Sequence, residues 1–113
     1  MGLRWKRFLL GRKVRRIQRS LERLAKAAAR EPLWVTRYGA FYIHPRHLVY
    51  WICVKTDAER DRLASDPNLV ASLHHTLVEC DYPLEGRSDV HIGFESQETV
   101  DRESEGNWWY HWK

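Results

Sequence analysis

The feature that most constrains this chain of 113 residues is a helical hydrophobic repeat near its N-terminus. Apolar residues recur there at spacings of three and four, so they share one stripe of a helix: Val14, Ile17, Leu21, Leu24 and Ala28. The opposite face is basic and carries Arg12, Arg15, Arg16, Arg19, Arg23, Lys26 and Arg30. Pro32 disfavours further helix. The pattern therefore predicts an amphipathic helix from about Arg12 to Arg30.

Each face of this helix predicts a different kind of contact. We expect the apolar stripe to pack on the chain's own sheet, or on a second copy through Val14, Ile17, Leu21 and Leu24. The arginine face should point to solvent or to a partner. Arginine suits nucleic-acid phosphates, and an acidic protein is an alternative. A membrane surface is the third candidate for residues 1–30, because bulky apolar groups precede the basic face: Trp5, Phe8, Leu9 and Leu10.

The charge is divided unevenly along the chain. Residues 1–31 carry eleven Lys or Arg against two Glu, a net charge of +9, whereas residues 32–113 carry eight basic against thirteen acidic groups, a net charge of −5. We therefore separate a basic helical segment, 1–31, from a compact α+β domain, 32–113, and expect a single folding unit. Either the basic segment meets an external anion, or the acidic stretch 95–105 neutralises it internally.

After Pro32 the hydrophobic pattern becomes alternating or forms short apolar runs, which is typical of β-strands. We expect strands, or strand partners, at Leu33–Tyr38, Ala40–Ile43, Leu48–Lys55, Val90–Phe94 and Trp108–Trp112. Thr56 with Glu59 forms a capping box, and Asp66-Pro67 is a typical helix start. The predicted fold class is α+β: the basic helix, then a mixed or antiparallel sheet of about four to five strands with one or two helices on one face.

Cysteine usage and the first ten residues bear on location. Cys53 and Cys80 are too few for a disulfide framework, and we expect both to be reduced. The apolar core of the first ten residues, Phe8 to Leu10, is too short for a secretory signal, although an Arg-rich mitochondrial presequence stays an alternative. We expect a cytoplasmic protein.

Catalytic and metal-binding candidates are few. His44-x-x-His47 offers two ligands from a turn, but a metal site needs more, so we predict no metal and no cofactor and treat both as turn residues. Polar groups after the strand at 90–94 offer an acid, a base and an anion clamp in Glu95, Asp101 and Arg102. A small hydrolase or nuclease would require His44 or His47 to lie close to one of these carboxylates or to a metal.

The C-terminal segment Trp108–Trp112 is the most aromatic part of the chain. As a strand, it would place Trp109 and His111 on the face opposite Trp108, Tyr110 and Trp112, and one face would be free for recognition unless the basic helix buries it. The sequence therefore favours a small non-catalytic binding protein of adaptor or inhibitor type that uses the basic helix and an aromatic C-terminal strand. A protein is the expected partner; a nucleic-acid binder is the first alternative, and a hydrolase or nuclease the second.

Overall fold

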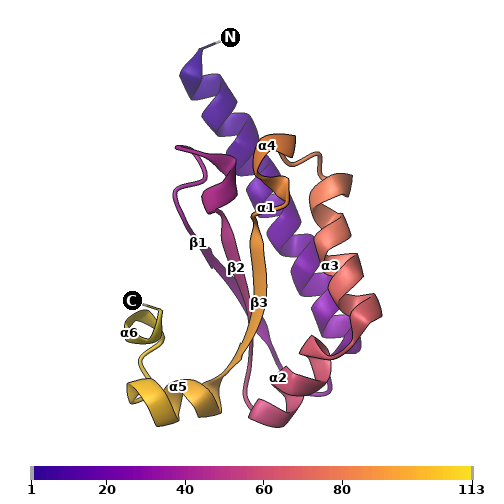
Figure 1. The fold of residues 1–113 in the computed structure, drawn as a ribbon, viewed down its shortest axis with the longest axis vertical. Coiled ribbons are helices and arrows are strands. Elements are labelled where there is room, and N and C mark those ends of the chain that lie inside the picture. The colour runs from indigo at the N-terminus through magenta and orange to yellow at the C-terminus, as the bar shows by residue number, and fades with distance from the viewer. Residues whose placement is uncertain (1, 113) are drawn as a thin grey trace.

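The computed structural model describes residues 2–112, without the side chain of Leu3. In chain order the elements are α1 (Leu3–Ala28), β1 (Trp34–Tyr38), a 3-10 turn η1 (Pro45–His47), β2 (Val49–Val54), α2 (Asp57–Ala64), α3 (Pro67–Glu79), α4 (Leu84–Arg87), β3 (His91–Ser96), α5 (Gln97–Ser104) and α6 (Trp108–His111). The α+β class is confirmed, with a long N-terminal helix beside a small sheet (Figure 1). The molecule is elongated and measures 47 × 30 × 20 Å.

The sheet has the order β1-β2-β3 and is mixed. β1 runs antiparallel to β2, with Val35 opposite Ile52, and β2 runs parallel to β3, with Ile52 opposite Phe94. The parallel pair needs a long connection, which α2 and α3 supply. Three strands among the described residues correct the expected four to five.

The apolar stripe of α1 lies in the core. Val14, Ile17, Leu21 and Ala25 are fully buried, and the Tyr50 hydroxyl donates a hydrogen bond to the Val14 carbonyl (2.6 Å). Leu73 and Leu77 of α3 are buried in the same core. The stripe is thus occupied by the chain's own sheet and α3. Leu24 and Ala28, which the pattern also placed in the stripe, are only half-buried at its margin.

The helix boundaries follow local signals in part. α1 begins at Leu3 rather than near Arg12, because no breaker lies between Leu3 and Gly11 and a single glycine in a helix costs only about 1 kcal/mol. It ends at Ala28, slightly before the predicted end at Arg30. The predicted N-cap residues are confirmed: the Thr56 hydroxyl accepts from the Glu59 amide (3.2 Å), and Asp66 caps α3. The reciprocal half of the capping box is made by Glu31 instead of Glu59, because Glu31 Oε1 accepts from the Thr56 amide (2.9 Å) while the Glu59 carboxylate accepts from Arg62. Among the described residues, no helix combines the length and the apolar character needed to cross a membrane.

Two predicted strands are not strands. Residues 40–43 form a turn, because Gly39 adopts a φ of +105° and a Cβ there would lie 1.8 Å from the His47 carbonyl oxygen. The expected C-terminal strand is the helix α6, since the Asn107 side chain accepts a hydrogen bond from the Tyr110 amide (2.9 Å). The acidic stretch 95–105 contains α5, which begins with a hydrogen bond from the Thr99 amide to the Ser96 hydroxyl (3.1 Å).

Helices cover both faces of the sheet, not one face as predicted. Side chains alternate along each strand, so Tyr50 and Ile52 face α1 and α3 whereas Trp51 faces the opposite side. On that opposite side, α6 packs through Trp112, whose ring stacks on Trp51. The basic helix and the aromatic segment therefore lie on opposite faces of the sheet (Figure 1).

Candidate binding groove at the edge of the sheet

A cluster of aromatic rings holds α6 against the sheet. Trp112 stacks on Trp51 with ring centroids 5.5 Å apart and an interplanar angle of 17°. Trp108 packs edge-on against Trp34 at 5.2 Å, and Tyr38 lies 6.1 Å from Trp112. Pairs of this kind contribute about 0.5–1.5 kcal/mol each beyond the area they bury. The cluster therefore fixes a helix of only four residues.

Polar contacts also hold α6 against β3 and α5. His111 of α6 lies with Nε2 2.9 Å from Glu95 Oε2 and with Nδ1 2.9 Å from Ser104 Oγ. The indole N–H of Trp108 donates to Gln97 Oε1 (2.7 Å). Burial raises the pKa of the Glu95 carboxyl, but hydrogen bonds from His111, the Ser96 amide and Arg60 outweigh it, and the pKa lies below its usual range.

The row Ser104, His111 and Glu95 has the composition of a catalytic triad, yet its geometry opposes nucleophilic catalysis. Ser104 is only 6% exposed. It also ends α5, where the helix dipole is negative and disfavours an oxyanion. The exposed carboxylates of Glu103 and Glu105 line the same hollow as Ser104. We therefore interpret the row as a clamp between β3, α5 and α6.

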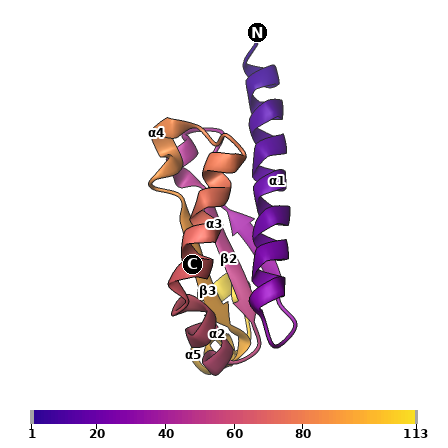
Figure 2. The ribbon, with the colours of Figure 1, turned by 90° about the vertical axis from the view of Figure 1, so that its right-hand side faces the viewer.

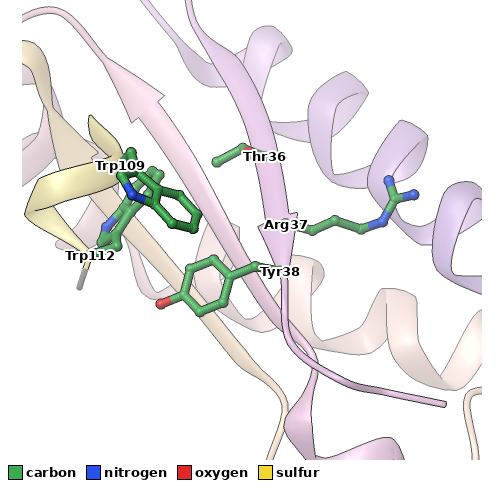
Figure 3. Close-up of a pocket in the computed structure, with 5 residues that line it drawn as sticks. All are labelled: Thr36, Arg37, Tyr38, Trp109 and Trp112. Atoms are coloured by element: carbon green, nitrogen blue, oxygen red, sulfur yellow. The ribbon is translucent and has the colours of Figure 1, made fainter. Parts of the chain in front are cut away.

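A groove of about 530 Å³ lies between α6 and β1. Its lining consists of Thr36, Arg37, Tyr38, Trp109 and Trp112 (Figure 3). Trp109 is 74% exposed and Tyr38 45% exposed, so the groove offers aromatic surface to solvent. Figure 3 shows Thr36 and Tyr38 on the side of the two tryptophans, whereas the Arg37 side chain points the other way, toward α1.

A smaller basic hollow of about 170 Å³ lies on the α1 side of the same strand. It is lined by Arg15, Gln18, Arg19, Glu22 and Arg37. Gln18 connects the helix to the strand: its Nε2 donates to the Val35 carbonyl (3.0 Å), and its Oε1 accepts from Arg37. Arg37 lines both the aromatic groove and the basic hollow, so the two lie on either side of this residue of β1.

The other polar candidates form a network at the ends of β2 and β3. Asp57 accepts hydrogen bonds from Ser96 and Thr99 and from Arg102 Nη1 (3.1 Å). These bonds lower the pKa of the Asp57 carboxyl to about 2. Arg60 joins the network through Glu95 (3.1 Å). The network ties α2 to the start of α5, and Arg102 acts in it as an ion-pair partner.

The histidines proposed for catalysis lie at the other end of the sheet. Leu48, next to η1, pairs with the start of β3 at His91, whereas Glu95 lies near its end. His44 Nδ1 accepts from the Arg46 amide (3.1 Å) and so caps η1, with the His47 ring 6.0 Å away. Asp101 accepts from Gln97 (2.8 Å). His44 and His47 therefore do not meet Glu95 or Asp101, and no three His, Cys, Asp or Glu side chains cluster as metal ligands within residues 2–112.

The arginine face of α1 is open to solvent. Its predicted members within the helix are all exposed: Arg12, Arg15, Arg16, Arg19, Arg23 and Lys26. Arg30 is also exposed but lies beyond the end of α1 at Ala28. The ion pairs of the α1 side chains in the described chain are Lys13 with Asp81 (3.4 Å) and Lys26 with Glu22 (2.7 Å). None of these pairs reaches the stretch 95–105, so within the described residues no ion pair joins that stretch to the basic helix.

Sequence reasoning found only part of the groove. It selected Trp109 as a recognition residue and placed His111 beside it, but His111 points to Glu95 and is mostly buried. It missed Tyr38, Trp112 and Arg37 as lining residues. Their side chains come together across more than seventy residues of sequence, and no local pattern signals such a pairing.

Comparison with known proteins gives no relative for this chain. No protein-family model matches it, and neither the curated proteins nor the solved structures contain a significant match. Its function must therefore be inferred from its own residues.

Proposed function

We propose that this chain is a small non-catalytic binding protein, of adaptor or inhibitor type, that captures an extended segment of a protein partner along β1. The observation that carries this proposal is the position of Arg37, which lines both the aromatic groove and the basic hollow. Within the described chain β1 is an edge strand that pairs with β2 alone. An edge strand offers backbone donors and acceptors to an added strand.

The alternation of side chains along a strand defines the segment that fits best. Every second side chain of an added strand would face Tyr38 and the tryptophans of α6, where apolar groups are favoured. The intervening side chains would face Arg15 and Arg37, where carboxylates are favoured. The Gln18 side chain already donates a hydrogen bond to the Val35 carbonyl, so an added strand would pair mainly with the Arg37 end of β1. The expected ligand is an alternating apolar and acidic segment.

Charge near the aromatic residues favours a protein segment over a nucleic acid at this groove. Glu103 and Glu105 are exposed and line the hollow next to Tyr110, which adjoins Trp109. A phosphate backbone following the aromatic side chains would meet these carboxylates. The cysteines are unpaired and buried, which supports a reducing compartment such as the cytoplasm.

Nucleic-acid binding through α1 is a second candidate, supported by the exposure of its whole arginine face. Such binding would weaken steeply with rising salt, since each phosphate contact releases a counterion. It would also be lost in an Arg15→Ala/Arg16→Ala/Arg19→Ala variant. Normal nucleic-acid binding by that triple variant would exclude this second candidate.

The proposed function is tested with a fluorescent peptide of alternating leucine and glutamate. Fluorescence anisotropy should show saturable binding, with affinity at least about tenfold lower for a leucine and lysine peptide or a serine and glutamate peptide. Arg37→Gln and Trp109→Ala should each weaken binding about tenfold, a typical cost for a contact residue at an interface centre. Trp5→Ala removes an exposed indole elsewhere and should change nothing. Equal binding of all three peptides would contradict the proposal.

A further inference from the structure

The outer face of α1 continues beyond the arginines to two aromatic residues. Residues at successive spacings of three and four occupy the side of the helix opposite the buried stripe: Trp5, Phe8, Arg12, Arg16, Arg19, Arg23 and Lys26. All of them are exposed. One helix face thus combines an aromatic end with a row of cations.

The aromatic end projects from the molecule. Trp5 is 46% and Phe8 51% exposed, and their rings stack at 5.6 Å. The N-terminal turns of α1 extend beyond the sheet and the other helices in both views (Figures 1 and 2). Arg7 lies over the Tyr42 ring at 5.5 Å and so connects these turns to the turn after β1. Two large aromatic side chains are therefore held in solvent, where they stabilise no core.

The cations of this face are largely uncompensated. No acidic residue precedes Glu22 in the chain. Lys26 pairs with Glu22, whereas the four arginines of the outer face form no side-chain ion pair within the described residues. Such a row attracts an extended anionic surface.

We propose that the outer face of α1 binds a membrane surface rich in anionic phospholipid, with the helix lying in the plane of the bilayer. The arginines contact lipid phosphates, and Trp5 and Phe8 enter the interfacial region, where aromatic side chains are favoured. Nucleic acid would use the cations but gives the stacked pair Trp5 and Phe8 no role. Arg19 of this face also lines the basic hollow beside β1, whereas Trp5, Phe8, Arg16 and Arg23 line neither that hollow nor the aromatic groove. Lipid binding through these four residues therefore does not depend on the peptide-binding function.

The test is sedimentation of the full chain with lipid vesicles at low and high salt. Vesicles with about 30% phosphatidylserine should bind the chain, pure phosphatidylcholine should bind it far less, and salt should weaken the binding. Trp5→Ser/Phe8→Ser and Arg16→Gln/Arg23→Gln should each lower the partition coefficient about tenfold or more. Trp109→Ser is the matched control, an exposed indole on the other side of the sheet, and should bind normally.

Two outcomes would overturn this proposal. One is absence of binding to the phosphatidylserine vesicles. The other is vesicle binding by Trp5→Ser/Phe8→Ser equal to that of the parent chain, because cations alone would then suffice, as they would for a DNA duplex tested in parallel. Circular dichroism checks that α1 stays helical, and a Trp5→Leu/Phe8→Leu variant, which keeps the apolar character, must retain binding.

Discussion

The absence of a side chain at Gly93 determines how the aromatic rings pack. A Cβ at Gly93 would lie 2.7 Å from Trp51 Cζ3 and 2.5 Å from His91 Nε2, closer than atoms can approach. Glycine therefore lets the Trp51 indole lie across β3. Since Trp112 stacks on Trp51, the position of α6 and the shape of the groove depend on this residue.

Gly93→Ala should destabilise the fold by about 1–3 kcal/mol, because Trp51 must move. Gly11→Ala is the matched control: its Cβ would meet nothing nearer than 3.5 Å, and an alanine in a helix should stabilise by about 0.5–1 kcal/mol. Urea unfolding measures both free energies, and near-ultraviolet circular dichroism follows the tryptophans. A stable Gly93→Ala variant with unchanged tryptophan signals would contradict the packing described for Trp51.

Asp57 makes stability depend on pH at the acid end. Its hydrogen bonds from Ser96 and Thr99 and its pairing with Arg102 hold the pKa at about 2 in the folded chain, below the value of about 3.9 expected when unfolded. A carboxyl whose pKa is lowered by folding stabilises the folded state at pH values above its unfolded pKa. This contribution is lost as the pH falls through the pKa of the folded state.

Asp57→Asn should therefore be less stable than the parent chain at neutral pH, and the difference should shrink between about pH 4 and pH 2. Urea unfolding at a series of pH values measures this. Asp101→Asn is the control, since Asp101 is exposed and accepts a hydrogen bond from Gln97. If the difference in unfolding free energy between Asp57→Asn and the parent chain stayed constant across the acid range, the contacts described for Asp57 would be contradicted.

At the scale of elements, α1 packs into the core through its apolar stripe and faces solvent through its arginine face. Ile17 and Leu21 are fully buried under the sheet, whereas Arg19 between them is exposed. Burying an Ile or Leu side chain contributes about 1.5–3 kcal/mol, so the stripe anchors the whole helix.

Ile17→Ala should cost about 2–5 kcal/mol, because it removes buried methyl groups and leaves a cavity. Arg19→Ala, on the exposed face, should change stability by no more than about 0.5 kcal/mol. Thermal unfolding of the two variants measures the contrast. Similar costs for both would mean that the helix does not pack through the stripe.

Elements with strong local signals could be predicted from the sequence. The spacing of Val14, Ile17 and Leu21 predicted α1, and the side chains of Thr56 and Asp66 predicted the starts of α2 and α3. Trp108–Trp112 was wrongly predicted to be a strand, because so short a run of aromatic residues fits a strand or a helix equally well. Asn107, a favoured cap residue, was the signal for a helix there.

At the scale of the whole molecule, the sheet separates the basic helix from the aromatic C-terminal segment, which were predicted from the sequence to act together. The basic helix covers one face and α6 the other, and Arg37 of the edge strand β1 lines a hollow on each side. That edge could not be predicted, since β1 and α6 lie about seventy residues apart and meet through tertiary packing. The same arrangement leaves the outer face of α1 free for an anionic surface.

The most direct test of the binding surface is an NMR titration of the labelled chain with the alternating leucine and glutamate peptide. Shift changes are expected at the amides of Arg37 and Tyr38, at the Trp109 indole and at Arg15, with the opposite sheet edge at His91 unchanged. Changes confined to one side of β1, or centred on His91, would contradict a binding surface that uses both sides of β1 at Arg37.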